Sequence, residues 1–125
     1  MQILETPPQQ AEHFEWLNAI EFYANYLDIV EERMNLLSVK QSRSHQLQLD
    51  YFREQMHLLR QELYTLSEYV GQHIEEIQLV PVEENRLEMD LQFIHHSGLR
   101  EGFDRFENLV NAFRNQFNDF YVKNL

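Results

Sequence analysis

The chain contains no cysteine, which excludes disulfide bonds, thiol catalysis, iron–sulfur clusters and thiolate zinc sites. Glycine and proline occur only three times each among 125 residues, so the sequence has little of the turn chemistry that an all-β sandwich or barrel requires. No apolar run approaches the roughly 18 residues of a membrane-spanning helix. These absences favour an all-α protein that does not cross a membrane.

Positive charge is also scarce. Ten Lys and Arg residues stand against 21 Asp and Glu, which gives a formal charge of −11. A surface this negative repels nucleic-acid phosphates and anionic lipids, so we expect neither a nucleic-acid partner nor a membrane. The first residues, MQILETPPQQ, lack the basic region and apolar core of a signal peptide, which predicts a cytoplasmic location.

Three segments carry apolar residues at alternating steps of three and four, the heptad pattern of helices that pack side by side. The three seams comprise Trp16, Ile20, Tyr23, Leu27, Val30, Met34 and Leu37; then Leu49, Phe52, Met56, Leu59, Leu63, Leu66, Val70, His73 and Ile77; then Phe103, Phe106, Val110, Phe113, Phe117 and Phe120. The phenylalanine seam has Asn, Arg, Asp and Glu between its members. It therefore resembles the wall of a core more than a cofactor pocket or a docking surface.

We predict an all-α, antiparallel up-down-up three-helix coiled-coil bundle that forms a single domain over residues 1–125. A loose leader at 1–9 precedes helices at about residues 11–39, 44–79 and 83–123, and Ser42 or Ser44 is expected to cap the second helix.

The start of the third segment alternates at period two, as a strand would, through Leu87, Met89, Leu91 and Phe93. No second strand of matching length exists, so we predict helix there. Its apolar phase slips at residues 95–98, which predicts overwinding, a kink or a break near Gly98.

The first helix carries a second apolar line beside its seam. This line includes Phe22, Tyr26, Ile29 and Leu36. A three-helix monomer would leave part of it exposed, and exposed apolar patches usually mark association surfaces. We therefore expect a homodimer or a protein partner at this line. The alternative is that a wide face of the first helix wraps around the bundle.

Di-metal four-helix proteins use two Glu-x-x-His motifs, but the chain has one, Glu54 to His57, at outward helix positions. No histidine is followed four residues later by His or Glu, which argues against a hemerythrin-like site. No nucleophile elbow or phosphate-binding glycine loop occurs either. We therefore assign no catalytic, cofactor-binding or metal-ligating residue, and we expect no enzyme and no cofactor.

His73 and His96 lie on core stripes, and antiparallel folding brings them within about 15 Å of His13 along the bundle axis. Four acids are expected near the same end: Glu12, Glu15, Glu68 and Glu88. One interpretation is a metal or proton-linked cluster. The other is that each imidazole makes one buried hydrogen bond and specifies the register of the helices.

Two stretches, HFEWLNAIEFYANYLDIVEERM and HSGLREGFDRFENLVNAFRNQFNDF, resemble an uncharacterised family of small cytoplasmic bacterial helical proteins. The resemblance covers most of the chain, with the middle helix matching least. Its motifs are carried by His13, Glu15, Trp16 and Leu17, and then by His96, Leu99, Arg100, Phe106 and Glu107. Gly98 and Gly102 stand where longer polar residues are expected, which puts the continuity of the helix there in doubt. The resemblance implies a three-helix coiled-coil protein and no reaction.

From the sequence, the first hypothesis for function is a non-enzymatic bundle that works through protein association. The alternative is a bundle that binds a metal or a small ligand at the end that holds His13, His73 and His96. A third and weaker hypothesis is reversible lipid contact through the first helix.

Overall fold

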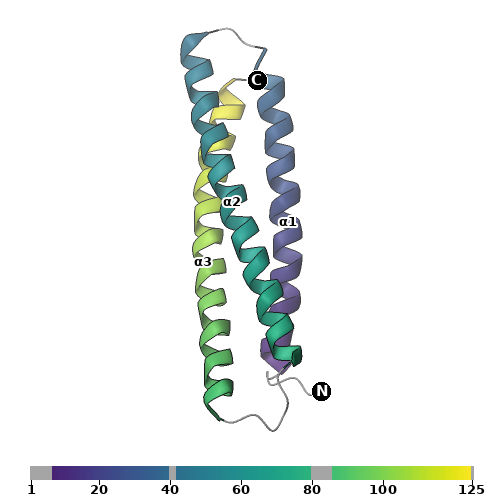
Figure 1. Ribbon diagram of the computed structural model, residues 1–125. Helices are drawn as coiled ribbons and strands as arrows, with labels where there is room; N and C mark the ends of the chain where they lie inside the picture. Colours follow the sequence, from purple (N-terminus) through teal and green to yellow (C-terminus); the bar gives the residue numbers. More distant parts are fainter. Residues whose placement is uncertain (1–6, 40–41, 80–85, 125) are drawn as a thin grey trace.

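The computed structural model describes residues 7–39, 42–79 and 86–124, with side chains described at 11–39, 42–75 and 96–124. Three long helices make up almost all of this: α1 (Pro7–Leu37), α2 (Arg43–Leu79) and α3 (Arg86–Lys123). They run up, down and up, and α2 runs diagonally from the side of α3 at the top of the view to the side of α1 at the bottom (Figure 1). The prediction of an all-α three-helix bundle is confirmed, and no strand occurs within the described ranges.

The three predicted seams meet in one core. Every seam member whose side chain is described is buried, apart from Ile20 and Tyr23, which are half-buried against the same core. All five phenylalanines of the third seam are buried, so that seam is a wall of the bundle as predicted. None of the helical stretches that the structure describes combines the length and the apolar character of a bilayer span.

The first helix begins earlier than predicted. It starts at Pro7, so residues 7–9 are helical rather than part of a loose leader, while 1–6 lie outside the described residues. Proline is well suited to a first turn, because its missing N–H would have no partner inside the helix and its fixed φ is helical. The helix also ends at Leu37 rather than 39, where the Ser38 hydroxyl donates to the Asn35 carbonyl at 2.6 Å.

Ser42 caps α2. Its hydroxyl accepts a hydrogen bond from the His45 backbone N–H at 3.1 Å, and its carbonyl accepts one from Gln46 N–H at 3.0 Å. The hydroxyl satisfies one of the N–H groups that a helix start leaves without a partner in the helix. Of the two predicted candidates, Ser42 is therefore the cap, and Ser44 lies inside the helix.

The third helix is unbroken from Arg86 to Lys123. Residues 87–93 are helical, as predicted. Of the three alternatives predicted near Gly98, which were overwinding, a kink and a break, the break does not occur. A helical glycine costs only about 1 kcal/mol relative to alanine, which good packing offsets. Such packing is present, because His96, Leu99 and Phe103 are all buried and continue the third seam back past Gly98.

A candidate metal centre of three histidines

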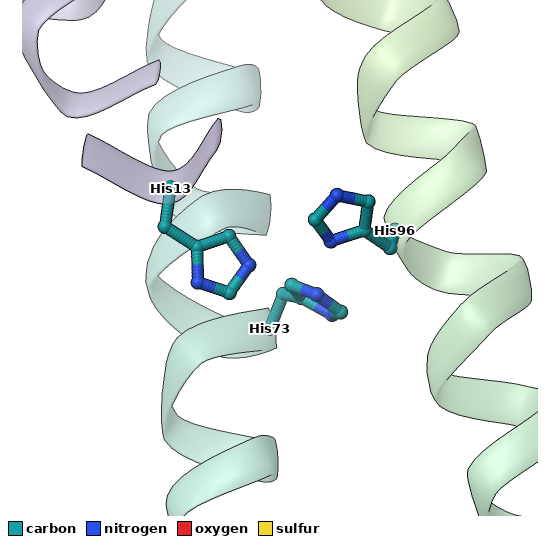
Figure 2. A group of neighbouring side chains, drawn as sticks. All are labelled: His13, His73 and His96. Carbon is teal, nitrogen blue, oxygen red and sulfur yellow. The ribbon is translucent and has the colours of Figure 1, made fainter. Parts of the chain in front are cut away.

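One layer of the bundle core consists of histidines. His13 from α1, His73 from α2 and His96 from α3 point toward one another between the helices (Figure 2). One nitrogen from each ring lies within 4.8 Å of the other two, and the ring centroids are 5.1, 5.2 and 5.5 Å apart. His73 and His96 are 3% and 1% exposed, while His13 is half-buried. The prediction that the fold brings these residues to one end is confirmed, and they lie far closer together than the axial estimate required.

The heptad pattern explains why they meet. His13 lies three residues before Trp16, His73 three after Val70, and His96 three before Leu99. Each imidazole thus occupies an inward seam position in its own helix. The helices α1 and α3 run opposite to α2 (Figure 1), and the three positions meet in one layer (Figure 2).

Trp16 covers the histidine layer on the side of the apolar core. Its ring lies 4.7 Å from that of His96 and 5.5 Å from that of His13, measured between centroids. It also stacks on Phe103 at 5.4 Å with an interplanar angle of 3°. Trp16 is only 6% exposed, so the imidazoles lie against a packed aromatic wall.

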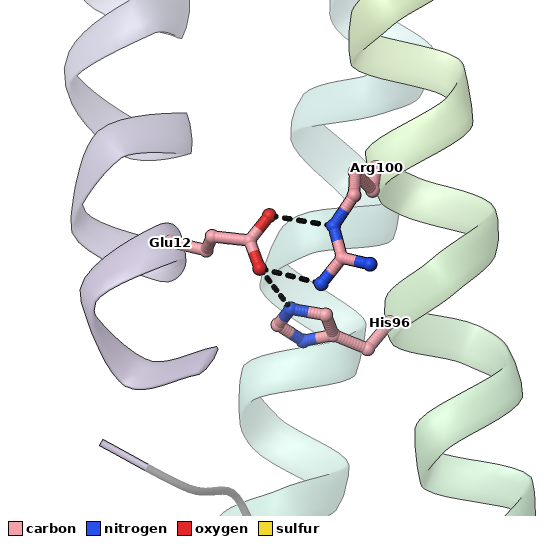
Figure 3. A network of polar contacts seen from close by, with 3 residues as sticks. All are labelled: Glu12, His96 and Arg100. Carbon is pink, nitrogen blue, oxygen red and sulfur yellow. Dashed lines mark hydrogen bonds and ion pairs between the residues drawn. The ribbon is translucent and has the colours of Figure 1, made fainter. Parts of the chain in front are cut away.

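A carboxylate lies directly behind one histidine. Glu12 Oε1 is 3.1 Å from His96 Nε2, and both oxygens of Glu12 accept hydrogen bonds from Arg100, at 2.6 and 2.8 Å (Figure 3). The hydrogen bond from Arg100 lowers the pKa of Glu12 from 4.5 to about 2, against the opposing effect of burial, and the contact with His96 lowers it further in the same direction. Glu12 is therefore ionised at neutral pH and can only accept hydrogen bonds.

This contact sets the tautomer of His96. Because the Glu12 carboxylate accepts, His96 Nε2 carries the proton, and in the neutral ring the lone pair is then on Nδ1. Metal-binding histidines almost always donate their second ring N–H to a carboxylate or carbonyl in this way, which orients the ring and raises its basicity. Glu12 and Arg100 thus prepare His96 to act as a nitrogen donor.

The donor set fits a first-row transition metal. Three imidazoles with one position left open are a known ligand set for zinc, with Zn–N distances of about 2.0–2.1 Å. Tetrahedral geometry then places the nitrogens about 3.4 Å apart. The present separations of up to 4.8 Å exceed this spacing by little more than an ångström, which small side-chain rotations can close. The arrangement can therefore bind a metal ion at little cost in backbone movement.

The other candidates named from the sequence lie elsewhere. Glu54 and His57 are exposed, as predicted, and His57 Nε2 lies 3.1 Å from the amide nitrogen of Gln61 one turn later. Of the four acids expected near the histidines, Glu12 reaches them. Glu15 and Glu68 are exposed, and the side chain of Glu88 lies outside the described residues.

Sequence reasoning missed another buried histidine, which lies at the opposite end of the bundle. His45 is 4% exposed, and its Nε2 lies 2.8 Å from the Leu37 carbonyl at the end of α1. Its Nδ1 lies 3.2 Å from Asn124 Oδ1, just after α3. The heptad pattern could have predicted its burial, because His45 comes four residues before Leu49 and so extends the second seam by one position. This histidine ties three chain segments together and has the structural role that we considered for the other three.

The second apolar line of α1 is largely exposed. We call Phe22, Tyr26, Ile29 and Leu36 the α1 stripe. Phe22, Ile29 and Leu36 are 62%, 45% and 69% exposed, and Tyr26 is half-buried. The alternative in which a wide α1 face wraps around the bundle therefore fails for three of these four residues.

Comparisons of the chain with protein-family models, with curated proteins and with solved structures find no match. The resemblance to a family of small bacterial helical proteins stays a prediction, and function is inferred from the geometry of the sites.

Proposed function

We propose that the protein binds a divalent transition-metal ion, with zinc as the first choice, through His13, His73 and His96. The observation that carries this proposal is the convergence of one imidazole from each helix within 4.8 Å in a largely buried layer. A single metal ion at this point would contact all three rings at once.

The ligand types favour zinc and its neighbours in the periodic table. Imidazole nitrogens suit Zn²⁺, Cu²⁺, Ni²⁺, Co²⁺ and Fe²⁺, whereas Mg²⁺ and Ca²⁺ prefer oxygen. With one ligand on each helix, the ion would hold together the ends of α1, α2 and α3. Since the ion would bind the folded chain far better than the unfolded chain, it would stabilise the fold by mass action.

Thermal unfolding tests this proposal. Zinc added to chelator-treated protein should raise the melting temperature of the native sequence and leave that of His73→Leu unchanged. Leucine fits the buried seam position, so this variant should still fold. His57→Ala, which removes an exposed histidine, should respond as the native sequence does. Equal stabilisation of His73→Leu would show that zinc binds elsewhere.

We propose as a second candidate that the chain self-associates or binds a protein through the α1 stripe. Three large apolar side chains spaced seven residues apart on one helix support this, because they form a continuous exposed line. Sedimentation of the native chain and of Phe22→Glu and Leu36→Glu variants tests it. We expect the native chain to sediment as an oligomer or with a partner, and the variants as monomers. A monomeric native chain that co-purifies with no partner would remove this candidate.

A further inference from the structure

A cavity of about 620 Å³ lies between α2 and α3 and reaches the histidine layer. Leu66 and His73 of α2 line it from one side, and Gly98, Leu99 and Gly102 of α3 from the other. Its size is within the range of small-molecule sites. His73 belongs both to the wall of this cavity and to the three-histidine cluster, so the cavity adjoins the candidate metal position.

Two helical glycines shape this cavity. A Cβ at Gly102 would lie 3.0 Å from Leu66 Cδ2, so this glycine lets α2 and α3 pack closely. A Cβ at Gly98 would meet no atom within 4 Å, so packing does not require glycine there. Glycine weakens a helix relative to alanine. The effect of Gly98 is to leave that part of the cavity wall without a side chain.

Charge indicates what would enter the cavity. Three neutral imidazoles leave the charge of a divalent ion uncompensated. The Glu12 carboxylate is engaged by Arg100 behind His96. A dication bound here would therefore favour an anionic oxygen ligand in its remaining coordination position. At the cavity rim, Arg105 is paired with Glu62 at 3.5 Å and both line the cavity, so the attraction for an anion comes from the bound dication.

We infer that the cavity admits a small monocarboxylate with a flat apolar body to the metal. A carboxylate oxygen would occupy the open coordination position. The apolar part would lie against Leu66 and Leu99, over the backbone at Gly98. This inference depends on the proposed metal site, and it adds to that site a ligand class and a route of entry.

Cobalt-loaded full-length protein gives the test, because the visible absorption of Co²⁺ reports changes in its ligands. Benzoate should shift the cobalt bands of the native chain, and acetate, which lacks the apolar ring, should bind at least about tenfold more weakly. Gly98→Leu places a side chain in the cavity and should weaken benzoate binding at least about tenfold while cobalt still binds. Gly71→Leu is the matched control, since Gly71 is also helical with open space beside it but lies outside this cavity.

The outcomes separate the two proposals. If cobalt binds and benzoate leaves its spectrum unchanged, or if Gly98→Leu binds benzoate as the native chain does, the cavity inference is overturned and the metal site stands. If no cobalt binds to the native chain, the metal site itself is wrong, and the inference falls with it.

Discussion

Glu12 and Arg100 lie 88 positions apart in the sequence and form a two-pronged ion pair, with nitrogen–oxygen distances of 2.6 and 2.8 Å. The pair joins the first turns of α1 to α3 (Figure 3). The same carboxylate contacts His96, so one interaction couples the packing of two helices to the orientation of a histidine in the proposed metal site.

Replacement of this carboxylate should weaken metal binding more than it weakens the fold. Glu12→Gln leaves all three histidines in place but removes the anion that orients His96. We expect zinc affinity to fall about 10- to 100-fold, as for other partners of metal-binding histidines. The half-exposed ion pair between Glu12 and Arg100 should contribute only about 1 kcal/mol to the free energy of unfolding. Calorimetric titration and urea denaturation measure the two effects. Asp119→Asn is the control, because it removes an exposed carboxylate in a pair with Lys123 at 2.9 Å.

Acid should weaken this end of the bundle. The pKa of Glu12 falls from 4.5 to about 2 in the folded chain, so its stabilising contribution is fully present above pH 4.5. That contribution is lost as the pH falls from about 4.5 toward 2, because the unfolded chain then binds a proton that the folded chain does not. Urea midpoints across this window should therefore decline more steeply for the native chain than for Glu12→Gln. Parallel declines would show that the ion pair does not form in solution.

Replacing a buried phenylalanine and replacing an exposed one should have very different effects on the free energy of unfolding. Phe117 is fully buried, and Phe117→Ala should cost about 3–5 kcal/mol. Phe22 is 62% exposed, and Phe22→Ala should change the monomer's stability by less than about 0.5 kcal/mol. Denaturation at low protein concentration compares them. A large cost for Phe22→Ala that grows with protein concentration would instead report self-association.

His45 should matter for stability and not for metal binding. His45→Ala removes the contacts to Leu37 and Asn124 and takes the histidine away from the buried Leu37 carbonyl. We therefore expect the free energy of unfolding to fall by about 1–3 kcal/mol. Zinc affinity should be unchanged, because His45 lies at the opposite end of the bundle from His13, His73 and His96. His57→Ala is the control for loss of a histidine from an exposed position. A drop in zinc affinity in His45→Ala would mean that the two ends are coupled.

Periodicity was sufficient to predict the core. Steps of three and four place residues such as Leu63 and Phe106 on the inward face of their helices, and inward faces must pack together. The same argument placed His73 and His96 inside. The change of apolar phase near Gly98 does not break the helix, because the seam continues without interruption from His96 onward.

The finer features of the site depend on rotation and stagger between helices, which a single seam does not determine. Glu12 and Arg100 flank their seams, and whether such neighbours touch is decided by shifts of a few ångströms. The cavity likewise depends on how closely α2 approaches α3 at Gly102, where a Cβ would lie 3.0 Å from Leu66. The sequence therefore predicts this end of the bundle and places Glu12 among four acids near it, but it does not distinguish Glu12 as the one that contacts His96.

Calorimetric titration of zinc into chelator-treated full-length protein tests the central claim most directly. We predict one zinc ion per chain for the native sequence, and none for a variant in which His13, His73 and His96 are all replaced by leucine. Circular dichroism should show that this variant keeps its helices, because leucine suits the two buried seam positions and the half-buried one. The claim is contradicted if the native chain binds no zinc, or if the triple variant binds it with the same affinity.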